Sequence, residues 1–339
     1  MGVSFSRARN LDEIIVNPLA TPPTSTMPQS PKLAIVVPCY NEEEVLPESA
    51  LHLSALLDEL AQSGLAQEAS VYFVDDGSTD RTWALIEELA ARDPRIHGIK
   101  LSRNYGHQSA LLAGLLSLPQ DAVITIDADL QDDLTAIKSM LHAYLAGAEI
   151  VYGIRRGRHS DTPFKRGTAE GYYRLLRAMG VRLIFNHADY RLLSQRVIDA
   201  LRSYPESNIF LRGLIPQLGF NSATVYYDRQ PRRAGKTKYS LSKMLGLALE
   251  GITSFSEVPL KLITILGILI SFGSFALAFW ALCIRILNPA AVPGWASIVI
   301  PLYLLGGIQL LCMGVIGQYL AKVYSETKRR PRFIVEKTL

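Results

Sequence analysis

Short apolar runs rich in β-branched residues alternate with longer stretches of helical periodicity from residue 32 onward. The apolar runs cover residues 32–38, 70–75, 96–101, 121–127 and 149–154. The stretches between them, at residues 43–62, 80–91, 105–117 and 133–146, are expected to form helices. Strands that alternate with helices indicate a parallel sheet with helices on both faces. The pattern therefore predicts an α/β fold with a mainly parallel sheet.

Two runs without any charged residue follow later, at residues 262–284 and 295–321. A helix needs roughly 20 apolar residues to cross about 30 Å of hydrocarbon, so each run is long enough to span a bilayer. Two buried core helices are the alternative interpretation. Because the loop between the runs is short, we expect a transmembrane hairpin over residues 259–321.

Basic residues flank both apolar runs and predict their orientation. Those before the first run are Lys236, Lys238, Lys243 and Lys261, and those after the second are Lys322, Lys328, Arg329, Arg330 and Arg332. The connecting loop offers only Arg285, at its edge. Because Lys and Arg favour the cytoplasmic side, we expect both ends of the hairpin in the cytoplasm, at the cell (inner) membrane.

The remaining segments complete the predicted organisation. Residues 1–31 include a stretch rich in Pro, Ser and Thr and are expected to be a flexible tail, followed by the α/β domain at residues 32–239. Residues 240–258 carry an apolar stripe at helical spacing, which suits a helix in the membrane interface. Packing of that helix against the α/β domain is the alternative. Residues 322–339 are expected to be a cytoplasmic tail.

The composition narrows the class of partner. Of 339 residues 49% are hydrophobic, and the net charge of +4 lies largely beside the two apolar runs. This placement favours anionic lipid headgroups over nucleic acid. The three cysteines show neither metal-binding spacing nor a disulfide framework.

Polar clusters follow four consecutive predicted strands. Their sequences are CYNEEE, DDGSTD, SRNYGHQS and DADLQDD. In parallel sheets, ligands bind outside the carboxyl ends of the strands. The four clusters therefore predict one binding site at that edge of the sheet.

The acidic cluster DADLQDD suggests a metal site. Asp127, Asp129 and Gln131 are spaced i, i+2, i+4 at the end of an extended segment, which can direct their oxygens at one point. Such hard oxygen ligands suit Mg²⁺ or Mn²⁺, which would also relieve the repulsion between neighbouring carboxylates. Asp132 and Asp133 are expected to stabilise the N-terminus of the next helix instead.

The cluster DDGSTD suggests nucleotide recognition. Asp75 and Asp76 can accept hydrogen bonds from a base or a ribose, while Asp80 is expected to cap the following helix. A simple turn is the alternative. Neither GxGxxG after the first strand nor GxxxxGK[ST] anywhere is present, which argues against a dinucleotide oxidoreductase and a P-loop NTPase.

Taken together, these segments resemble a known family. VVPCYNEE, VDDGSTD, LSRNYGHQSALLAGL, DADLQD, DYRLLS and RRAGKTKYS, with two spans ending in RRPRF, are similar to the family 2 glycosyltransferases of GT-A fold. The likeness is strongest to the polyprenyl-phosphate glycosyltransferases, which include bactoprenol glucosyltransferases and dolichol-phosphate mannose synthases. It covers about residues 32 to 335.

The resemblance implies roles for individual residues. Around the nucleotide it implies Pro38, Tyr40, Glu42, Asp75, Asp76, Arg103, Gly106 and Asp127. As ligands of a metal on the diphosphate it implies Asp127, Asp129 and Gln131, with Asp129 also counted as catalytic. For the acceptor phosphate it implies Arg155, Arg166, Arg232, Lys236 and Lys238. The chain departs from the family pattern at two positions. Lys236 stands where Glu is common, and Thr237 stands where Ser is usual.

Asp189 matches an acidic position proposed as a catalytic base. The acceptor phosphate is already largely an anion at neutral pH, however, because its second pKa lies near 6 by analogy with phosphate monoesters. The need for a base is therefore weak. The alternative is that Asp189 positions a sugar hydroxyl or an arginine.

The implied reaction is an inverting transfer of a sugar from a UDP-sugar to a membrane polyprenyl phosphate, with Mg²⁺ or Mn²⁺ as cofactor. Glucose is the expected sugar, and GlcNAc and an aminosugar stay open, as does GDP in place of UDP. A homo-oligomer such as a tetramer is also expected, since the C-terminal RFIVEKTL can add a strand to a neighbouring chain.

Two other functions compete with this one. A processive polysaccharide synthase of the same fold would carry a QxxRW motif and more spans, and the chain has neither. A non-catalytic scaffold or flippase subunit that binds sugar nucleotides would need no acidic metal motif beside three further polar clusters.

Overall fold

The computed structural model describes residues 15–16, 30–129, 131–156, 187–206, 211–228, 258–287 and 296–339. The chain divides into two compact units. One comprises Met1–Thr168, Leu183–Lys238 and Arg330–Leu339, and the other comprises Ala169–Arg182 and Tyr239–Arg329.

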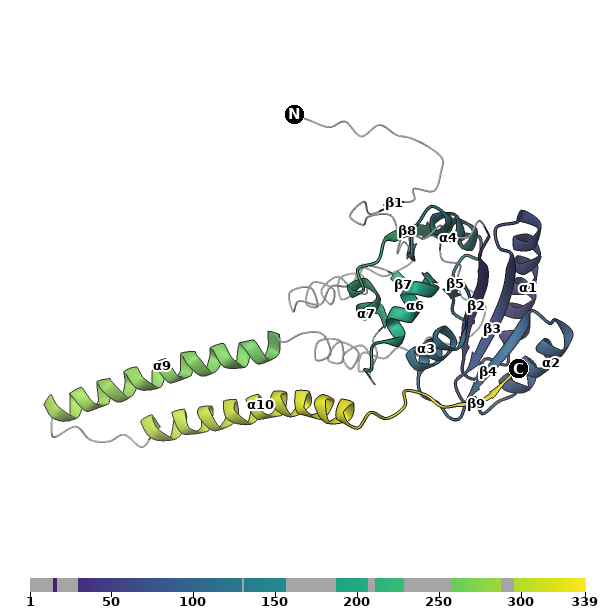
Figure 1. Ribbon diagram of the computed structural model, residues 1–339. Coiled ribbons are helices and arrows are strands. Elements are labelled where there is room, and N and C mark those ends of the chain that lie inside the picture. Colours follow the sequence, from purple (N-terminus) through teal and green to yellow (C-terminus); the bar gives the residue numbers. More distant parts are fainter. Residues whose placement is uncertain are drawn as a thin grey trace, which may run out of the picture. The chain divides into compact units, whose positions relative to one another are not determined.

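The first unit is built on a nine-stranded sheet (Figure 1). Its strands are β1 (Ile15–Val16), β2 (Lys32–Cys39), β3 (Glu68–Asp75), β4 (Ile96–Leu101), β5 (Ala122–Thr125), β6 (Ile150–Arg155), β7 (His187–Ser194), β8 (Ser222–Tyr227) and β9 (Val335–Thr338). They lie in the order β1-β8-β6-β7-β5-β2-β3-β4-β9. The first four apolar runs thus form the strands expected of them, and the fifth forms β6.

Most strands point the same way. β2 pairs in parallel with β3 and β5, β3 with β4, and β6 with β8. β7 lies antiparallel between β5 and β6, so β6 and β8 run in the same direction as β2 to β5. Only β1, β7 and β9 run the opposite way among the described strands. The predicted mainly parallel α/β sheet is confirmed.

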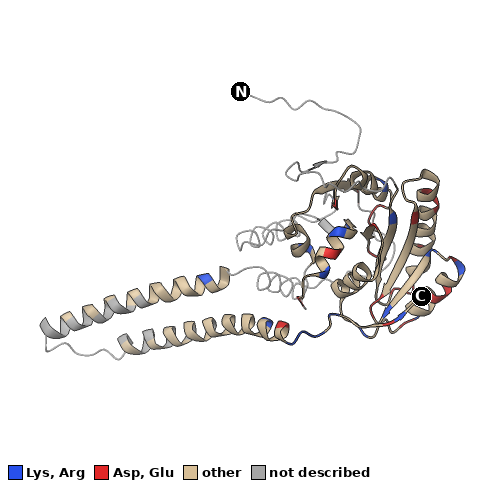
Figure 2. Ribbon diagram, in the orientation of Figure 1, with Lys and Arg blue, Asp and Glu red and all other residues tan. Residues whose placement is uncertain are grey.

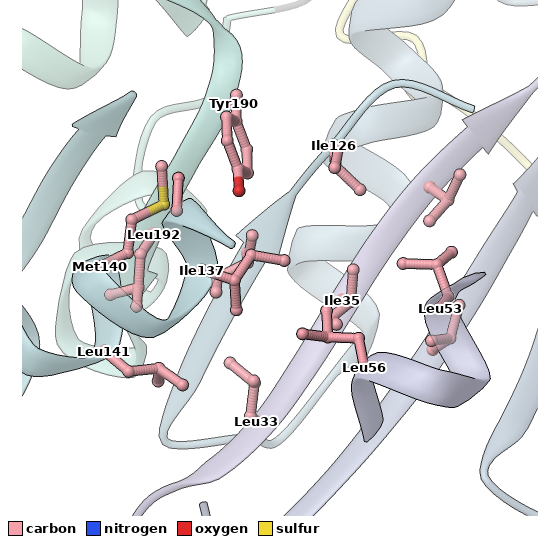
Figure 3. Close-up of a cluster of buried hydrophobic side chains, with 14 of the residues drawn as sticks. Leu33, Ile35, Leu53, Leu56, Ile126, Ile137, Met140, Leu141, Tyr190 and Leu192 are labelled. Atoms are coloured by element: carbon pink, nitrogen blue, oxygen red, sulfur yellow. The ribbon is translucent and has the colours of Figure 1, made fainter. Parts of the chain in front are cut away.

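Helices cover both faces of the sheet. They are α1 (Leu46–Ser63), α2 (Thr82–Arg92), α3 (His107–Ser117), α4 (Ala136–Leu145), α6 (Gln195–Arg202) and α7 (Leu211–Gln217). Alternate β2 side chains face opposite layers, because side chains alternate along a strand. Leu33 and Ile35 pack in the core with residues of α1 and α4 (Figure 3) and with Ile86 of α2. Ala34 and Val36 pack with residues of α3, α6 and α7.

The C-terminal residues complete one edge of this sheet. β9 pairs antiparallel with β4, and the Ser102 amide donates a hydrogen bond to the Ile334 carbonyl at 3.0 Å. Lys337 Nζ lies 2.7 Å from Glu87 Oε1 on α2. RFIVEKTL thus adds a strand to the sheet of its own chain, and the expected addition to a neighbouring chain stays a prediction. The expected tail at 322–339 divides between α10 and β9.

The expected N-terminal tail also contributes to the sheet. Ile15–Val16 forms β1, which pairs antiparallel with β8. Apart from this pair and residues 30 and 31, the tail lies outside the described residues.

The second unit contains two long helices, α9 (Val258–Leu287) and α10 (Ala296–Thr327). Many of their large apolar side chains are exposed, among them Phe272, Phe279, Leu310, Met313 and Leu320. Figure 2 shows few charged residues along the described parts of either helix. Among the residues that the structure describes, no helix has both the length and the apolar character needed to cross a membrane. The transmembrane hairpin expected from the sequence stays a prediction.

Candidate functional site

The loops after β2 and β3 are bonded to each other at the carboxyl edge of the sheet. Cys39 pairs with Asp75 in register, and the Asp76 amide donates to the Cys39 carbonyl at 2.9 Å. The Asn41 side-chain oxygen accepts from the Thr79 amide at 2.9 Å, and the Asn41 amide donates to Ser78 Oγ at 3.0 Å. The first two predicted polar clusters therefore form one rigid rim.

Asp75 has the features of a ligand-binding carboxylate. It is buried, and its Oδ1 accepts from the Ser78 amide at 3.1 Å. Its Oδ2 is buried without a hydrogen-bond partner in the described part of the chain. Burial raises the pKa of Asp75, although the bonds from Ser78 and the charge of Lys100 oppose the shift. A buried acceptor without a partner is costly, so this oxygen is suited to receive an N–H or O–H from a ligand.

Asp76 holds the third polar cluster against this rim. Its two carboxylate oxygens accept from the amides of Tyr105 at 2.7 Å and Gly106 at 2.9 Å. Burial raises the pKa of Asp76 in spite of these two bonds. Asp76 therefore positions the loop after β4, and its expected contact with the nucleotide stays a prediction.

The other expected nucleotide residues lie around Asp75. Pro38 is buried at the end of β2, whereas Tyr40, 45% exposed, presents its ring to solvent. The Glu42 amide donates to Thr82 Oγ1 at 2.9 Å. The Arg103 guanidinium lies 4.0 Å above the centre of the Tyr105 ring. Asp80 lies one residue before Arg81, the N-cap of α2, and accepts from the amide of Thr82, the first residue of that helix, at 3.0 Å.

Two elements and a bond within the loop hold the acidic loop after β5. Ser49 of α1 donates to the Ala128 carbonyl at 2.6 Å, and Tyr190 of β7 donates to the Asp133 carbonyl at 2.9 Å. The Gln131 side-chain amide donates to Asp129 Oδ2 at 2.8 Å. Gln131 thus presents nitrogen to Asp129 and orients that carboxylate. The Asp133 carboxylate accepts from the Thr135 amide at 2.9 Å, just before α4, as expected.

Asp127 and Asp129 suit the coordination of Mg²⁺. This ion binds one or two protein carboxylates and completes its coordination shell with water and substrate oxygens. Burial raises the pKa of Asp127 to about 6; His107 opposes the shift, and the carboxylates of Asp189, Asp132 and Asp129 add to it. A bound cation would offset this cost of ionisation. Within the described ranges, no group of three or more His, Cys, Asp or Glu side chains is arranged to hold a metal ion.

Asp132 differs from its expected role. It is buried, and its Oδ1 accepts from Tyr227 Oη at 2.6 Å and from Arg155 Nη2 at 3.1 Å. Arg155 also donates from Nε to Tyr227 Oη at 3.1 Å. The stabilisation of the next helix predicted for Asp132 is therefore wrong, because a buried carboxylate needs close cationic or hydrogen-bonding partners. The same pairing engages Arg155, which was expected at the acceptor phosphate.

Asp189 joins four side chains at the same edge of the sheet. β7 runs antiparallel to β5, and the hydroxyl of Thr125 donates to the Asp189 carbonyl, which places Asp189 beside the end of β5. Its carboxylate accepts from Arg191, from Arg212 and from Gln108. His107 Nε2 lies 3.3 Å from Asp189 Oδ2 and 3.7 Å from Asp127 Oδ1.

These partners determine the charge of Asp189. Burial alone raises its pKa, but the hydrogen bond from His107 and the charges of Arg191 and Arg212 outweigh burial and hold the pKa well below the usual carboxyl range. The His107 pKa is lowered by burial and raised more strongly by the two carboxylates, so its net shift is upward. Asp189 is therefore ionised, and its carboxylate is bonded to the four side chains around it.

The comparison with known proteins decides the family. Residues 34–202 match the family model described as "Glycosyl transferase family 2". An "Uncharacterized glycosyltransferase YkoT" of Bacillus subtilis (strain 168) is 49% identical over 309 residues, 90% of this chain and 91% of that protein. The chain belongs to glycosyl transferase family 2.

A further relative extends over the same length. The "Prophage bactoprenol glucosyl transferase homolog" of Escherichia coli (strain K12) is 37% identical over 307 residues, which is 90% of this chain and 99% of that protein. Among solved structures, the mannosyltransferase PcManGT of Pyrobaculum calidifontis in complex with GDP-Man and Mn²⁺ is 16% identical, with a TM-score of 0.43, and covers 92% of this chain and 89% of that one.

The candidate site contains residues that the sequence did not single out. His107 and Gln108 lie in a recognised polar cluster, SRNYGHQS, but nothing in the pattern linked them to Asp189. Arg191 is two residues from Asp189, and Arg212 lies beyond the matched region, on α7. Arg191 lies in the segment DYRLLS, of which only Asp189 was given a role, and Arg212 carried no local signal. Four expected acceptor residues, Arg166, Arg232, Lys236 and Lys238, and the expected interfacial helix at 240–257, lie outside the described residues.

Proposed function

We propose that this glycosyltransferase transfers a sugar from a nucleoside diphosphate sugar to a polyprenyl phosphate. The observation that carries the proposal is the 37% identity to the bactoprenol glucosyl transferase homolog, which spans 99% of that protein. Relatives alike over their full length share both the catalytic domain and the C-terminal segment beyond it. UDP-glucose is the donor proposed on this basis.

The rim around Asp75 is proposed to bind the nucleoside. Its unpartnered buried oxygen supports recognition of an N–H or O–H donor, and the exposed ring of Tyr40 supports stacking on a base. Asp76 acts on the same site by holding the Tyr105–Gly106 backbone in place.

Asp127 and Asp129 would hold Mg²⁺ or Mn²⁺, and Gln131 orients the carboxylate of Asp129. Such a cation, when bound, stabilises the negative charge that develops on a leaving diphosphate. The protein contributes the fixed position of the carboxylates, through Ser49 and Tyr190.

The acceptor phosphate is proposed to attack the anomeric carbon directly. As a phosphate monoester with a second pKa near 6, it is largely a dianion at neutral pH and needs no base to become a nucleophile. A single in-line displacement inverts the anomeric centre, and the nucleoside diphosphate leaves with the electron pair of the broken bond.

We also propose that α9 and α10 anchor the enzyme in the membrane, with the catalytic domain in the cytoplasm, and that the protein forms a homo-oligomer. The uncharged runs at 262–284 and 295–321 support membrane anchoring, as do the exposed apolar side chains of both helices, which need an apolar cover. The basic residues outside the runs support the orientation.

Transfer is tested with purified protein in neutral detergent. Undecaprenyl phosphate is incubated with Mg²⁺ and a panel of UDP-glucose, UDP-GlcNAc and GDP-mannose, and lipid-linked sugar is measured by mass spectrometry. The expected result is a product from one donor and none when undecaprenol replaces its phosphate. Release of free sugar without any lipid product would contradict the proposal.

The topology is tested by thiol labelling of a variant in which Cys39, Cys283 and Cys312 are replaced by alanine. A cysteine at Asn288 is expected to react with an impermeant reagent in intact cells. A cysteine at Ser325 is expected to react only after lysis. The reversed pattern would contradict the proposed orientation.

A further inference from the structure

The carboxylate of Asp189 is saturated by donors. Its Oδ1 accepts from Arg191 and, at 3.2 Å, from Arg212 Nε. Its Oδ2 accepts from Arg212 Nη2 at 2.8 Å and from Gln108 at 3.3 Å, and it lies 3.3 Å from His107 Nε2. A carboxylate offers about four lone-pair positions, and these donors occupy them. Asp189 therefore has no position left for a proton taken from a substrate.

The Arg212 guanidinium and the His107 ring are the parts of this cluster that reach solvent, and the His107 side chain is 45% exposed. Arg191 is buried, whereas the Arg212 side chain is 35% exposed. Nε and Nη2 of Arg212 bind the two oxygens of Asp189 side by side, which fixes the plane of the guanidinium. A second contact holds the helix that carries it, because Gln108 accepts from the Leu211 amide at 3.2 Å while donating to Asp189.

The cluster lies beside the reacting groups of the proposed mechanism. Thr125 bonds the Asp189 backbone at the end of β5, two residues before Asp127. His107 links the two carboxylates, at 3.3 Å from Asp189 and 3.7 Å from Asp127. A planar guanidinium held at such a place matches phosphate oxygens, which arginine binds through paired N–H groups.

We propose that Asp189 is a positioning residue that holds Arg212 as a binding group for a substrate phosphate, and that it does not act as a base. The inference rests on the proposed function, which supplies the two phosphate-bearing substrates. The phosphate belongs either to the donor diphosphate or to the acceptor lipid, and the two are separated by experiment. Arg212 contributes its positive charge and its planar guanidinium to the binding of that phosphate.

The test is a double-mutant cycle of Asp189→Asn and Arg212→Lys, assayed for transfer to undecaprenyl phosphate. Arg212→Lys keeps the charge and loses the fork, so kcat/KM should fall roughly 10- to 100-fold, as for a lost hydrogen bond to a charged group. The kcat/KM of Asp189→Asn should fall by a similar factor. The double variant should be no worse than the more severe single variant, because both changes remove one interaction.

The affinity for UDP shows which substrate carries the phosphate that Arg212 binds. UDP affinity is measured by calorimetry without acceptor, and the melting temperature is measured for each variant. Weaker UDP binding by Arg212→Lys assigns the phosphate to the donor, whereas unchanged UDP binding with a raised acceptor KM assigns it to the lipid. Either result supports the inference. Asp199→Asn, which removes an exposed ion pair with Arg202, is the matched control and should change neither quantity.

Two outcomes would overturn the inference while wild-type transfer stands. In the first, Arg212→Lys has the transfer activity of the wild type while Asp189→Asn is inactive, which is the result expected if Asp189 acts as a base. In the second, the two losses multiply in the double variant. Absence of lipid product from the wild type would instead contradict the proposed function itself.

Discussion

Gly77 lies so close to Arg103 that a Cβ atom on residue 77 would be 2.4 Å from the Arg103 carbonyl carbon and 2.6 Å from the Asn104 nitrogen. Real Cβ atoms do not approach backbone at this distance, and Gly77 also has φ +66°. The loops after β3 and β4 therefore pack against each other only with glycine at this position. The proposed donor site depends on a contact between backbones.

Gly77→Ala should weaken UDP binding and lower the free energy of unfolding by about 1–3 kcal/mol, because the added methyl group pushes the loop after β4 away and strains the backbone. Calorimetry and urea unfolding measure the two effects. Gly64→Ala is the matched control: its φ is +65° but no atom lies within 4 Å of the added Cβ, so it should cost stability without affecting UDP binding. Equal UDP affinity in all three proteins would contradict this account of the site.

Asp75→Asn should lose UDP affinity by roughly 10-fold or more, because the buried acceptor Oδ2 is replaced by a donor in one amide orientation and its negative charge is lost in either. The free protein should not be destabilised at pH 7. Burial raises the pKa of Asp75, so its ionised form is unfavourable in the fold. Calorimetry and urea unfolding again provide the two measurements. A large loss of stability with retained UDP binding would give Asp75 a structural role.

Asp127 should make stability depend on pH. Its pKa rises from 3.8 to about 6 in the folded protein, so folding favours its protonated form. The resulting stabilisation is present below about pH 4 and is lost as the pH rises through about 6. The difference in unfolding free energy between wild type and Asp127→Asn should therefore shift against the wild type between pH 4 and pH 7. Parallel pH profiles for the two proteins would contradict the raised pKa.

Removal of the metal should abolish transfer. Activity should vanish in EDTA and return with Mg²⁺ or Mn²⁺, and Asp129→Ala should lose transfer by on the order of 100-fold or more, as when an electrostatic partner of the transition state is removed. Mg²⁺ should also raise the melting temperature of the wild type more than that of Asp129→Ala, because a ligand stabilises the state that binds it. Full activity in EDTA would contradict the metal assignment.

Deletion of residues 333–339 should weaken UDP binding as well as stability. Ile334, the residue before β9, accepts from the Ser102 amide at the start of the loop whose other end Asp76 holds. Without these residues the loop loses this hydrogen bond at its start. A synthetic peptide of residues 330–339 should restore part of the affinity, and Lys337→Gln, which breaks only the exposed pair with Glu87, should leave it unchanged. Unaltered UDP affinity in the truncated protein would contradict the coupling.

The sequence by itself determined the first half of the sheet and its active edge. The runs at 32–38, 70–75, 96–101 and 121–127 became β2 to β5, because apolar periodicity is a local property that burial in a parallel sheet enforces. Since parallel strands end at one edge, the four polar clusters had to meet there. The resemblance to family 2 glycosyltransferases was likewise carried by these local segments, and the family match confirms it.

Only the tertiary structure decided how distant segments complete that edge. The pairing of β7 with β5 brings Asp189 to Asp127, and the packing of α7 brings Arg212 to Asp189, although no pattern near either residue indicates a partner. In the same way the open edge of β4 recruits β9 from the end of the chain, and the buried environment of Asp132 pairs it with Arg155. These contacts arise from unpaired strand edges and buried charges that need a partner. Such requirements are met in space, among residues that are far apart in the sequence.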